Sequence, residues 1–337
     1  MKHVFGPVPS RRLGRSLGID PVPLKTCNFN CVYCQLGRTR PLQRKRRAFF
    51  NVTDMVAEIA STLDHHGPDA IDWITFVGSG ETTLFSRLGS LIRYVKSLTD
   101  VPVAVITNGS LLYLPEVRDD LVAADAVLPS LDAGTETLYR KINRPHRDLS
   151  FDRQVSGLIE FRKMYTGNLW VEVMLLDGVN DSPSDLSDIS EVLKRVEPDE
   201  VHISTPIRPP AEPWVEMPTP ESLERASAIL GSVARVPPTV DMDVEPGIDE
   251  GLVQAVLAIV RRHPMQEDEL VRNLARWMPR RVVETLRCLA DGGKIRPVER
   301  HGRRFWCAAA TRFPDQKPGG RSRRDRRGTH ANRVFSA

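Results

Sequence analysis

The sequence predicts an α/β protein, a partial six-unit (β/α)6 barrel followed by a smaller C-terminal winged-helix domain. Two observations lead to this prediction. Short apolar runs alternate six times with longer helical patterns between residues 16 and 236, and after a proline-rich segment three helical patterns and a hairpin follow. Alternation of strand and helix is typical of a parallel sheet with right-handed crossovers, and six units are fewer than the eight of a complete barrel.

Each expected strand is a short apolar run with turn-forming residues beside it. The six strands are expected at 16–20, 71–77, 101–107, 126–131, 168–176 and 201–204. Helices are expected at 53–63, 84–98, 115–123, 152–165, 184–196 and 220–233. In parallel α/β folds the active face lies at the carboxyl ends of the strands, so functional residues are expected in the loops after them.

The second part of the chain has a different pattern. We expect the barrel domain at 1–236, a linker at 237–250, the winged-helix domain at 251–312 and a basic disordered tail at 313–337. The winged-helix prediction rests on helices at 251–263, 266–275 and 279–290 and a hairpin at 294–306. The tail carries seven Lys or Arg against two Asp, a charge of +5, so the rest of the chain sums to about −1 and the net charge of +4 comes from the tail. Such a tail is typical of a solvated end, and it can also bind nucleic acid through phosphates.

Composition narrows the class of protein. The 337 residues are 41% hydrophobic, which is enough for a sizeable core. The N-terminus lacks the apolar run of a signal peptide, and no window approaches the roughly 18 apolar residues of a membrane span. We therefore expect a cytoplasmic protein without membrane contact, and a monomer.

Three of the five cysteines lie in one short segment, Cys27-Asn28-Phe29-Asn30-Cys31-Val32-Tyr33-Cys34. The odd count and this clustering argue against a disulfide framework and favour a metal site. One loop of this kind can hold three corners of a cubane cluster and leave the fourth iron open to a ligand. A structural zinc site and an electron-transfer cluster are the alternatives, and both normally use four protein ligands. Cys288 and Cys307 fall in the C-terminal domain and are interpreted as ordinary residues of it.

The spacing of Cys27, Cys31 and Cys34, with Tyr33 before the last cysteine, resembles the radical S-adenosylmethionine superfamily. The resemblance implies a [4Fe–4S] cluster on the three cysteines. It also implies S-adenosylmethionine on the fourth iron, reductive cleavage to a 5′-deoxyadenosyl radical, and a flavodoxin- or ferredoxin-type electron donor.

Further matches follow the expected strands. Gly78-Ser79-Gly80-Glu81 resembles the family's Gly-Gly-Glu segment, in which glycines allow close approach and the carboxylate receives the methionine ammonium. The resemblance implies that polar residues at the later strand ends contact the rest of the cofactor. The residues expected to bind S-adenosylmethionine are Tyr33, Gly78, Gly80, Glu81, Asn108, Ser130, Asp132 and Asn180.

Basic residues bracket the cysteine loop. Arg11 and Arg12 precede it, and the run 38–47 follows it. The stretch 6–18 resembles the bacterial relatives of the wyosine-forming tRNA enzyme, although no second cysteine set precedes Cys27. We therefore expect tRNA or another nucleic acid as the substrate, reached through this basic rim, the winged helix and the tail. Arg208, after the sixth strand, is expected either to bind a substrate anion or to form a rim salt bridge.

Two other functions remain open at this point. One is a radical enzyme that modifies a peptide or protein, with the C-terminal domain as its recognition module. The other is an iron–sulfur redox sensor with a DNA-binding winged helix. Because winged helices serve all of these roles, the predicted fold does not decide between them.

Overall fold

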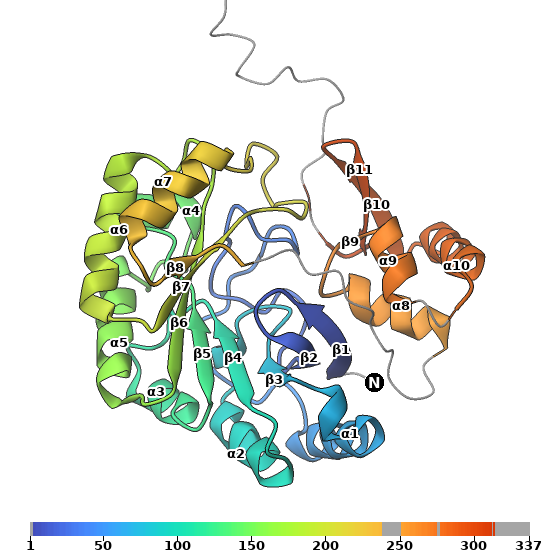
Figure 1. Ribbon diagram of the computed structural model, residues 1–337. Coiled ribbons are helices and arrows are strands. Elements are labelled where there is room, and N and C mark those ends of the chain that lie inside the picture. The colour runs from blue at the N-terminus through green and yellow to red at the C-terminus, as the bar shows by residue number, and fades with distance from the viewer. Residues whose placement is uncertain (1–2, 238–250, 275–276, 312, 314–337) are drawn as a thin grey trace, which may run out of the picture.

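The computed structural model describes residues 3–237, 251–274, 277–311 and 313. The larger part is an eight-stranded sheet in the strand order β1 to β8, with helices α1 to α7 packed along its outer side (Figure 1). Every neighbouring pair from β2 to β8 is parallel, and β1 pairs with β2 in the antiparallel direction. The strands are β1 (Val4–Ser10), β2 (Gly14–Ile19), β3 (Trp73–Phe76), β4 (Val103–Thr107), β5 (Ala126–Pro129), β6 (Asn168–Met174), β7 (Glu200–Ser204) and β8 (Ala234–Arg235).

The helices follow the strands along the chain and cover the sheet. They are α1 (Val52–His66), α2 (Leu88–Leu98), α3 (Pro115–Leu121), α4 (Glu136–Ile142), α5 (Phe151–Met164), α6 (Pro183–Val196) and α7 (Pro220–Leu230). Several begin at a side chain that accepts a backbone N–H, such as Ser150 for α5 and Ser182 for α6. The parallel α/β architecture expected from the sequence is therefore confirmed.

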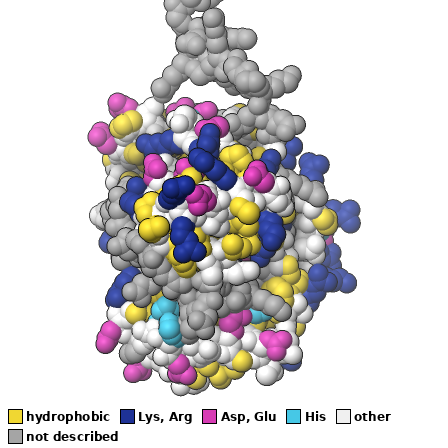
Figure 2. Space-filling view, turned by 90° about the vertical axis from the view of Figure 1, so that its right-hand side faces the viewer, with side chains coloured by type: hydrophobic (Ala, Val, Ile, Leu, Met, Phe, Trp, Pro, Cys, Tyr) yellow, Lys and Arg dark blue, Asp and Glu magenta, His cyan; other side chains and the backbone are white. Residues whose placement is uncertain are grey.

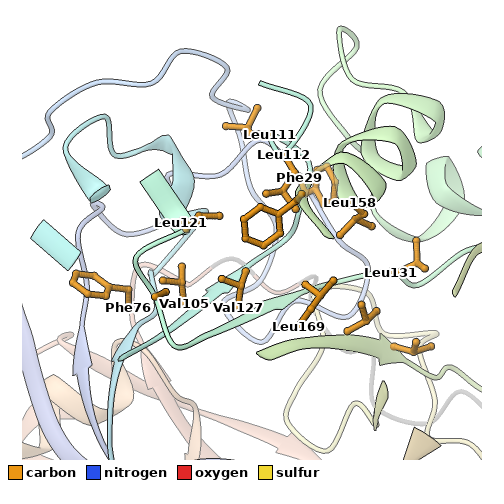
Figure 3. Close-up of a cluster of buried hydrophobic side chains, with 14 of the residues drawn as sticks. Phe29, Phe76, Val105, Leu111, Leu112, Leu121, Val127, Leu131, Leu158 and Leu169 are labelled. Atoms are coloured by element: carbon orange, nitrogen blue, oxygen red, sulfur yellow. The ribbon is translucent and has the colours of Figure 1, made fainter. Parts of the chain in front are cut away.

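The two faces of the sheet bury different side chains, because successive residues of a strand point to opposite sides. The outer face and the helices form the main core, in which Phe29 of the cysteine loop lies with Val127 and Leu158 (Figure 3). The inner face holds a second, smaller cluster around Leu13 and Leu128. Packing on both faces keeps the strand ends in a fixed relation to one another.

The described residues between 251 and 313 form a separate unit at the side of the sheet (Figure 1). It has its own core, which includes Leu270, Leu286 and Trp306. Its elements are α8 (Leu252–Val260), β9 (Met265–Gln266), α9 (Glu267–Asn273), α10 (Pro279–Asp291), β10 (Ile295–Arg300) and β11 (Arg303–Ala308). The three expected helices and the hairpin are present, and β9 pairs with β11 to make a three-stranded sheet.

The exposed side of this C-terminal unit is strongly charged. In Figure 2, where this side faces the viewer, Lys and Arg side chains are gathered with Asp and Glu among them. Arg280 pairs with Glu284 and Arg304 with Glu299, so part of the expected basic surface is neutralised locally. The predicted linker, apart from Pro237, and the predicted tail, apart from Phe313, lie outside the described residues.

Several element boundaries differ from those expected. The predicted helix at 84–98 begins only at Leu88, because Phe85 is extended and pairs with Arg47. Strand β1 was not expected, since Pro7 and Pro9 argue against a strand, but an edge strand tolerates proline. Helix α4 was also not expected; it is short, and Thr135 caps its first turn.

Candidate functional site

The cysteine loop lies between β2 and α1, at the carboxyl edge of the sheet. Backbone hydrogen bonds connect it to the loop after β3 and to the C-terminal end of α4. The Thr26 carbonyl accepts from Glu81 N at 2.8 Å, and Val32 N donates to Ile142 O at 2.9 Å. A Cβ added at Gly80 would lie 1.9 Å from the Thr26 oxygen, so glycine is required where the two loops meet. The predicted cluster loop and the predicted glycine segment are thus in direct contact.

Each of the three sulfur atoms has an N–H donor beside it. The thiols of Cys27, Cys31 and Cys34 are half-buried and unpaired. Such N–H groups stabilise thiolates and tune the potential of an iron–sulfur cluster. The donors are Phe29 N (3.4 Å) and Asn108 Nδ2 (3.8 Å) for Cys27, Asn143 Nδ2 (3.8 Å) for Cys31, and Lys25 Nζ (3.5 Å) for Cys34.

In the chain without a cluster, Cys27 and Cys31 have raised pKa values. Burial, with a smaller contribution from Glu81, raises the pKa of Cys27 to about 12, and burial also raises the pKa of Cys31 well above its usual range. Cluster binding must therefore displace protons, as for other thiolate ligands. Across the described ranges, no three His, Cys, Asp or Glu side chains are arranged to hold a single metal ion. A cubane cluster does not need three ligands around one ion, because each cysteine binds a separate iron.

Asp132 links two parts of the cysteine loop. Its Oδ2 accepts hydrogen bonds from Tyr33 Oη and Asn143 Nδ2, both at 2.6 Å, and its Oδ1 accepts from Met174 N at 2.9 Å. Asn143 is also the donor beside Cys31. Burial raises the pKa of Asp132 to about 6 and, together with Asp132, raises the pKa of Tyr33. Asp132 therefore orients the aromatic ring and one thiol donor together.

Both carboxylate oxygens of Glu81 accept hydrogen bonds from other groups of the protein. Its Oε1 accepts from Thr83 N (2.9 Å), Thr83 Oγ1 (2.5 Å) and Thr107 Oγ1 (2.5 Å), and its Oε2 accepts from Asn108 N (2.7 Å). Four donors match the roughly four lone-pair sites of a carboxylate. Glu81 thus ties the end of β3 to the end of β4, and this geometry favours a positioning role over the expected contact with an ammonium.

Asn180 and Ser130 differ in whether their side chains have hydrogen-bonding groups left for a ligand. Asn180 is fully buried, and its amide bonds only backbone groups, those of Leu176, Asp132 and Met174. It therefore shapes the loop after β6. Ser130, at the end of β5, is half-buried, and the described residues provide no partner for its hydroxyl. That hydroxyl is free to meet a ligand.

An ion pair on the inner face of the sheet was missed by the sequence analysis. Arg12 pairs with Glu172 of β6 at 2.9 Å, and Ser204 Oγ donates to the same carboxylate at 2.6 Å. Burial tends to raise the pKa of Glu172, but Arg12 and Ser204 outweigh it and the pKa is lowered. The backbone of Glu172 forms a parallel β-bridge with that of Ser130. The Glu172 carboxylate therefore belongs to a residue beside the end of β5. The alternation of apolar and polar residues along β6 was the sequence signal that could have placed Glu172 on the inner face.

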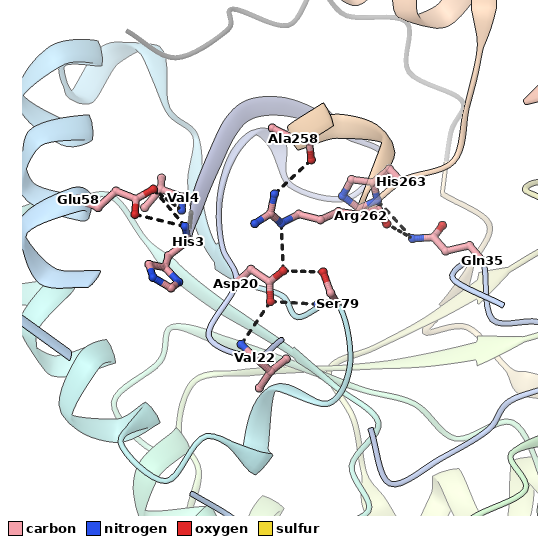
Figure 4. A network of polar contacts seen from close by, with 10 residues as sticks. All are labelled: His3, Val4, Asp20, Val22, Gln35, Glu58, Ser79, Ala258, Arg262 and His263. Carbon is pink, nitrogen blue, oxygen red and sulfur yellow. Dashed lines mark hydrogen bonds and ion pairs between the residues drawn. The ribbon is translucent and has the colours of Figure 1, made fainter. Parts of the chain in front are cut away.

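The C-terminal unit contacts the predicted site directly (Figure 4). Arg262 Nε lies 3.0 Å from Asp20 Oδ2, and Asp20 accepts hydrogen bonds from Ser79 N and Ser79 Oγ of the glycine segment. Gln35, which follows Cys34, donates to Arg262 O at 3.1 Å. The C-terminal unit is therefore linked to both loops expected to bind the cofactor.

Arg208 lies in the same interface. Its Nη1 donates to Gln35 Oε1 at 2.9 Å, and Gln35 Nε2 is 3.3 Å from His263 Nδ1. Burial and then Arg11 lower the pKa of Arg208 to about 10, and burial followed by Arg208 and Arg262 lowers the pKa of His263 to about 3. Among the described residues Arg208 does not form the rim salt bridge that was one of its two expected roles, and its guanidinium contacts Gln35, the residue after Cys34.

The basic run at 38–47 is less open than expected. Arg38 donates to both carboxylate oxygens of Glu212, which also pairs with Arg144. Arg44 and Arg46 pair with Asp148 and Asp120. These ion pairs hold the run against the barrel. None of the helices in the described part of the chain has the length and apolar composition of a membrane span.

Comparisons with known proteins bear on this site. The radical SAM superfamily model matches residues 22–189, which span the cysteine loop, the glycine segment and strands β3 to β6. A UPF0026 protein from Methanocaldococcus jannaschii is 34% identical over 310 residues, covering 91% of this chain and 96% of that protein. The chain belongs to the UPF0026 family of the radical SAM superfamily. It is therefore an iron–sulfur enzyme, and its cofactors are a [4Fe–4S] cluster and S-adenosylmethionine.

Other similarities cover less of the relative or of this chain. A Brachyspira hyodysenteriae protein named GTPase Obg is 38% identical over 307 residues, 88% of this chain, but the chain spans only 43% of that protein. A probable dual-specificity RNA methyltransferase RlmN from Streptococcus mutans is 21% identical over 181 residues, 50% of this chain and 48% of that protein. A radical SAM methyltransferase from Sphaerobacter thermophilus shares the fold, with a TM-score of 0.50, 18% identity and 66% coverage of each chain.

Proposed function

We propose that Cys27, Cys31 and Cys34 hold the [4Fe–4S] cluster of this UPF0026 enzyme and leave its fourth iron to S-adenosylmethionine. The observation that carries the proposal is the N–H donor beside each of the three sulfurs, on a loop at the carboxyl edge of the sheet. The donor set fits a cluster, because soft thiolates select iron–sulfur clusters and N–H groups stabilise their charge. When bound, the cluster and S-adenosylmethionine supply a 5′-deoxyadenosyl radical that abstracts a hydrogen atom from the substrate.

The chain's own residues then divide into two groups. Tyr33, Gly78, Gly80 and Ser130 are proposed to face S-adenosylmethionine, since the glycines allow close backbone approach and the Ser130 hydroxyl is available. Glu81, Asn108, Asp132 and Asn180 are proposed to position these groups, because their side chains are bonded to the loops that carry them. An electron from a flavodoxin- or ferredoxin-type donor would reduce the cluster. The C-terminal unit, a proposed winged helix, would recognise the substrate.

RNA is the proposed substrate. The similarity to a protein named as an RNA methyltransferase supports it, as does the resemblance of residues 6–18 to relatives of the wyosine-forming tRNA enzyme. The exposed arginines of the C-terminal unit are suited to phosphate contacts. The C-terminal unit lies beside the sheet (Figure 1), where its surface can contribute to binding a macromolecule.

The test is turnover in the presence of RNA. The anaerobically reconstituted enzyme is reduced with dithionite and given S-adenosylmethionine, and 5′-deoxyadenosine is measured with and without total tRNA. We expect tRNA to increase the rate at about 50 mM salt and to lose most of this effect at about 200 mM, because phosphate contacts weaken steeply with salt. A rate that tRNA does not change at either concentration would contradict an RNA substrate and favour the peptide alternative.

A further inference from the structure

A basic cavity lies next to the cluster loop, on the side formed by the loop after β4 and by α4 and α5. It is a cavity of about 600 Å³ between the cluster loop, the loop after β4 and the segment from α4 to α5. Asn28, the residue after Cys27, forms part of its wall. The residues that matter for its chemistry are Arg44, Tyr113, Arg140, Arg147, Ser150 and Arg153.

The cavity carries an excess of positive charge. Four guanidinium groups line it against one carboxylate, that of Asp148. Arg44 pairs with Asp148, and Arg140 pairs with Glu136 at 2.6 Å. The Arg147 side chain is 91% exposed and lies 3.8 Å from Asp148, whose charge Arg44 already engages.

Arg153 has its charge directed at the cavity. Its Nη1 donates to a backbone carbonyl, Asp148 O, at 2.9 Å, and not to a carboxylate. Arg147 and Arg153 thus retain charge for a ligand. A neutral ligand would gain nothing from them, whereas a phosphate can accept charge-assisted hydrogen bonds from both.

The rest of the lining suits a nucleotide better than a bare anion. The Arg153 guanidinium lies over the Tyr113 ring, 5.3 Å from its centroid, and leucine side chains form an apolar wall beside it. Ser150 caps the first turn of α5, so this end of the helix adds partial positive charge. Aromatic and guanidinium planes next to a cationic groove are the features that bind single-stranded nucleic acid.

The position of the cavity connects it to the reaction. The Asn28 side chain bonds Ser110 Oγ at 2.8 Å and accepts from Asn108 Nδ2 at 2.7 Å, and Asn108 is the donor beside Cys27. A nucleotide held here would therefore contact the cluster loop itself, at the residue that follows Cys27.

We propose that this cavity binds a phosphate and the adjoining nucleotide of a single-stranded RNA substrate, at a position that flanks the nucleotide presented to the active site. The inference rests on the proposed RNA substrate. It adds a specific subsite on the barrel, formed by Arg147, Arg153 and Tyr113, to the recognition expected of the C-terminal unit.

The test is binding of a fluorescein-labelled oligouridylate of about twelve nucleotides to the full-length reconstituted protein, measured by anisotropy. The variant is Arg147→Ser with Arg153→Ser. Its matched control is Arg93→Ser with Arg195→Ser, two exposed arginines on the outer helices α2 and α6. We expect the cavity variant to weaken binding roughly tenfold and to reduce the salt slope by about 1 to 2, with the control within about twofold.

Two further variants keep the result interpretable. Arg147→Lys with Arg153→Lys preserves the charge and is expected to keep most of the affinity, which separates lost charge from a disturbed fold. Tyr113→Leu should weaken binding about fivefold or more while leaving the salt slope unchanged, because stacking carries no charge. Iron content is compared across all variants.

The outcomes separate this inference from the proposed function. Equal weakening in the cavity variant and in its control would overturn the subsite while leaving an RNA substrate in place. Failure of the wild-type enzyme to bind the oligonucleotide or to respond to tRNA would overturn both.

Discussion

The ion pair between Asp20 and Arg262 is expected to hold the C-terminal unit against the predicted cofactor loops. Arg262 Nε lies 3.0 Å from Asp20 Oδ2, and the two side chains are only 13% and 5% exposed. Removing one member of a buried pair costs about 3–5 kcal/mol, because the other charge is left uncompensated. Asp20 keeps donors from Ser79 and Val22, so the low end of this range applies.

The expected values follow from this geometry. Arg262→Met and Asp20→Asn should each lower the free energy of unfolding by about 3 kcal/mol. Methionine is chosen because it keeps the contact with Phe5, whose ring centroid lies 4.6 Å from the Arg262 guanidinium. The double variant should lose about 4 kcal/mol, which gives a coupling energy of about 2 kcal/mol.

The assay is urea denaturation followed by tryptophan fluorescence, since Trp306 is buried in the core of the C-terminal unit. All four proteins are compared at the same salt concentration and cluster content. A coupling energy below about 0.5 kcal/mol would refute the reasoning, because the two residues would then contribute independently.

Three further predictions concern the glycine segment, Asp132 and the core of the C-terminal unit. Gly80→Ala should lower the iron content after reconstitution, because its Cβ would lie 1.9 Å from Thr26 O; Gly251→Ala, whose Cβ meets nothing within 4 Å, is the control and should retain iron. Burial raises the pKa of Asp132 from 3.8 to about 6, so the folded cluster-free protein holds this proton more tightly than the unfolded chain, and its stability falls as pH rises through that window. Asp132→Asn should therefore gain roughly 3 kcal/mol relative to wild type between about pH 4 and pH 7, and parallel denaturation curves would contradict this. Leu286→Ala should cost about 2–5 kcal/mol in urea denaturation, because the side chain is fully buried in the C-terminal core, and a loss below about 1 kcal/mol would contradict that packing.

Signals that are local in sequence predicted the outline of the fold and the site. The spacing of Cys27, Cys31 and Cys34 is itself a chemical pattern, and the apolar runs of β3 to β7 are strong enough to be recognised singly. The loops after these strands converge because parallel strands end at one edge of a sheet. The apolar runs thus predicted the fold class, and the cysteine spacing predicted the position of the cluster.

Contacts between distant segments were not predictable in this way. Glu81 matches a family motif, but the donors from Thr107 and Asn108 that fill its carboxylate come from another strand. The contact between Asp20 and Arg262 spans 242 residues, and no spacing rule points to it. The register of β6, which turns Glu172 towards Arg12, also depends on the folded sheet.

Local preferences also gave way to tertiary contacts at some boundaries. Residues before Leu88 fit a helical pattern, yet Arg47 N donates to Leu84 O and Ser86 N donates to Arg47 O. These two bonds hold Phe85 in an extended conformation, between a 3-10 turn at Thr82–Leu84 and the start of α2. A pairing partner about 40 residues earlier in the chain therefore overrode the helical preference of this short segment.

The measurement that tests the central claim most directly is formation of 5′-deoxyadenosine by the reconstituted, dithionite-reduced protein, beside Cys27→Ala, Cys31→Ala and Cys34→Ala. Cys288→Ala is the matched control, because that thiol is exposed on α10 of the C-terminal unit. We expect product from the wild type and the control, with iron content and product lost in each of the other three variants. Product from any of those three at the wild-type rate would contradict the assignment of the cluster to this loop.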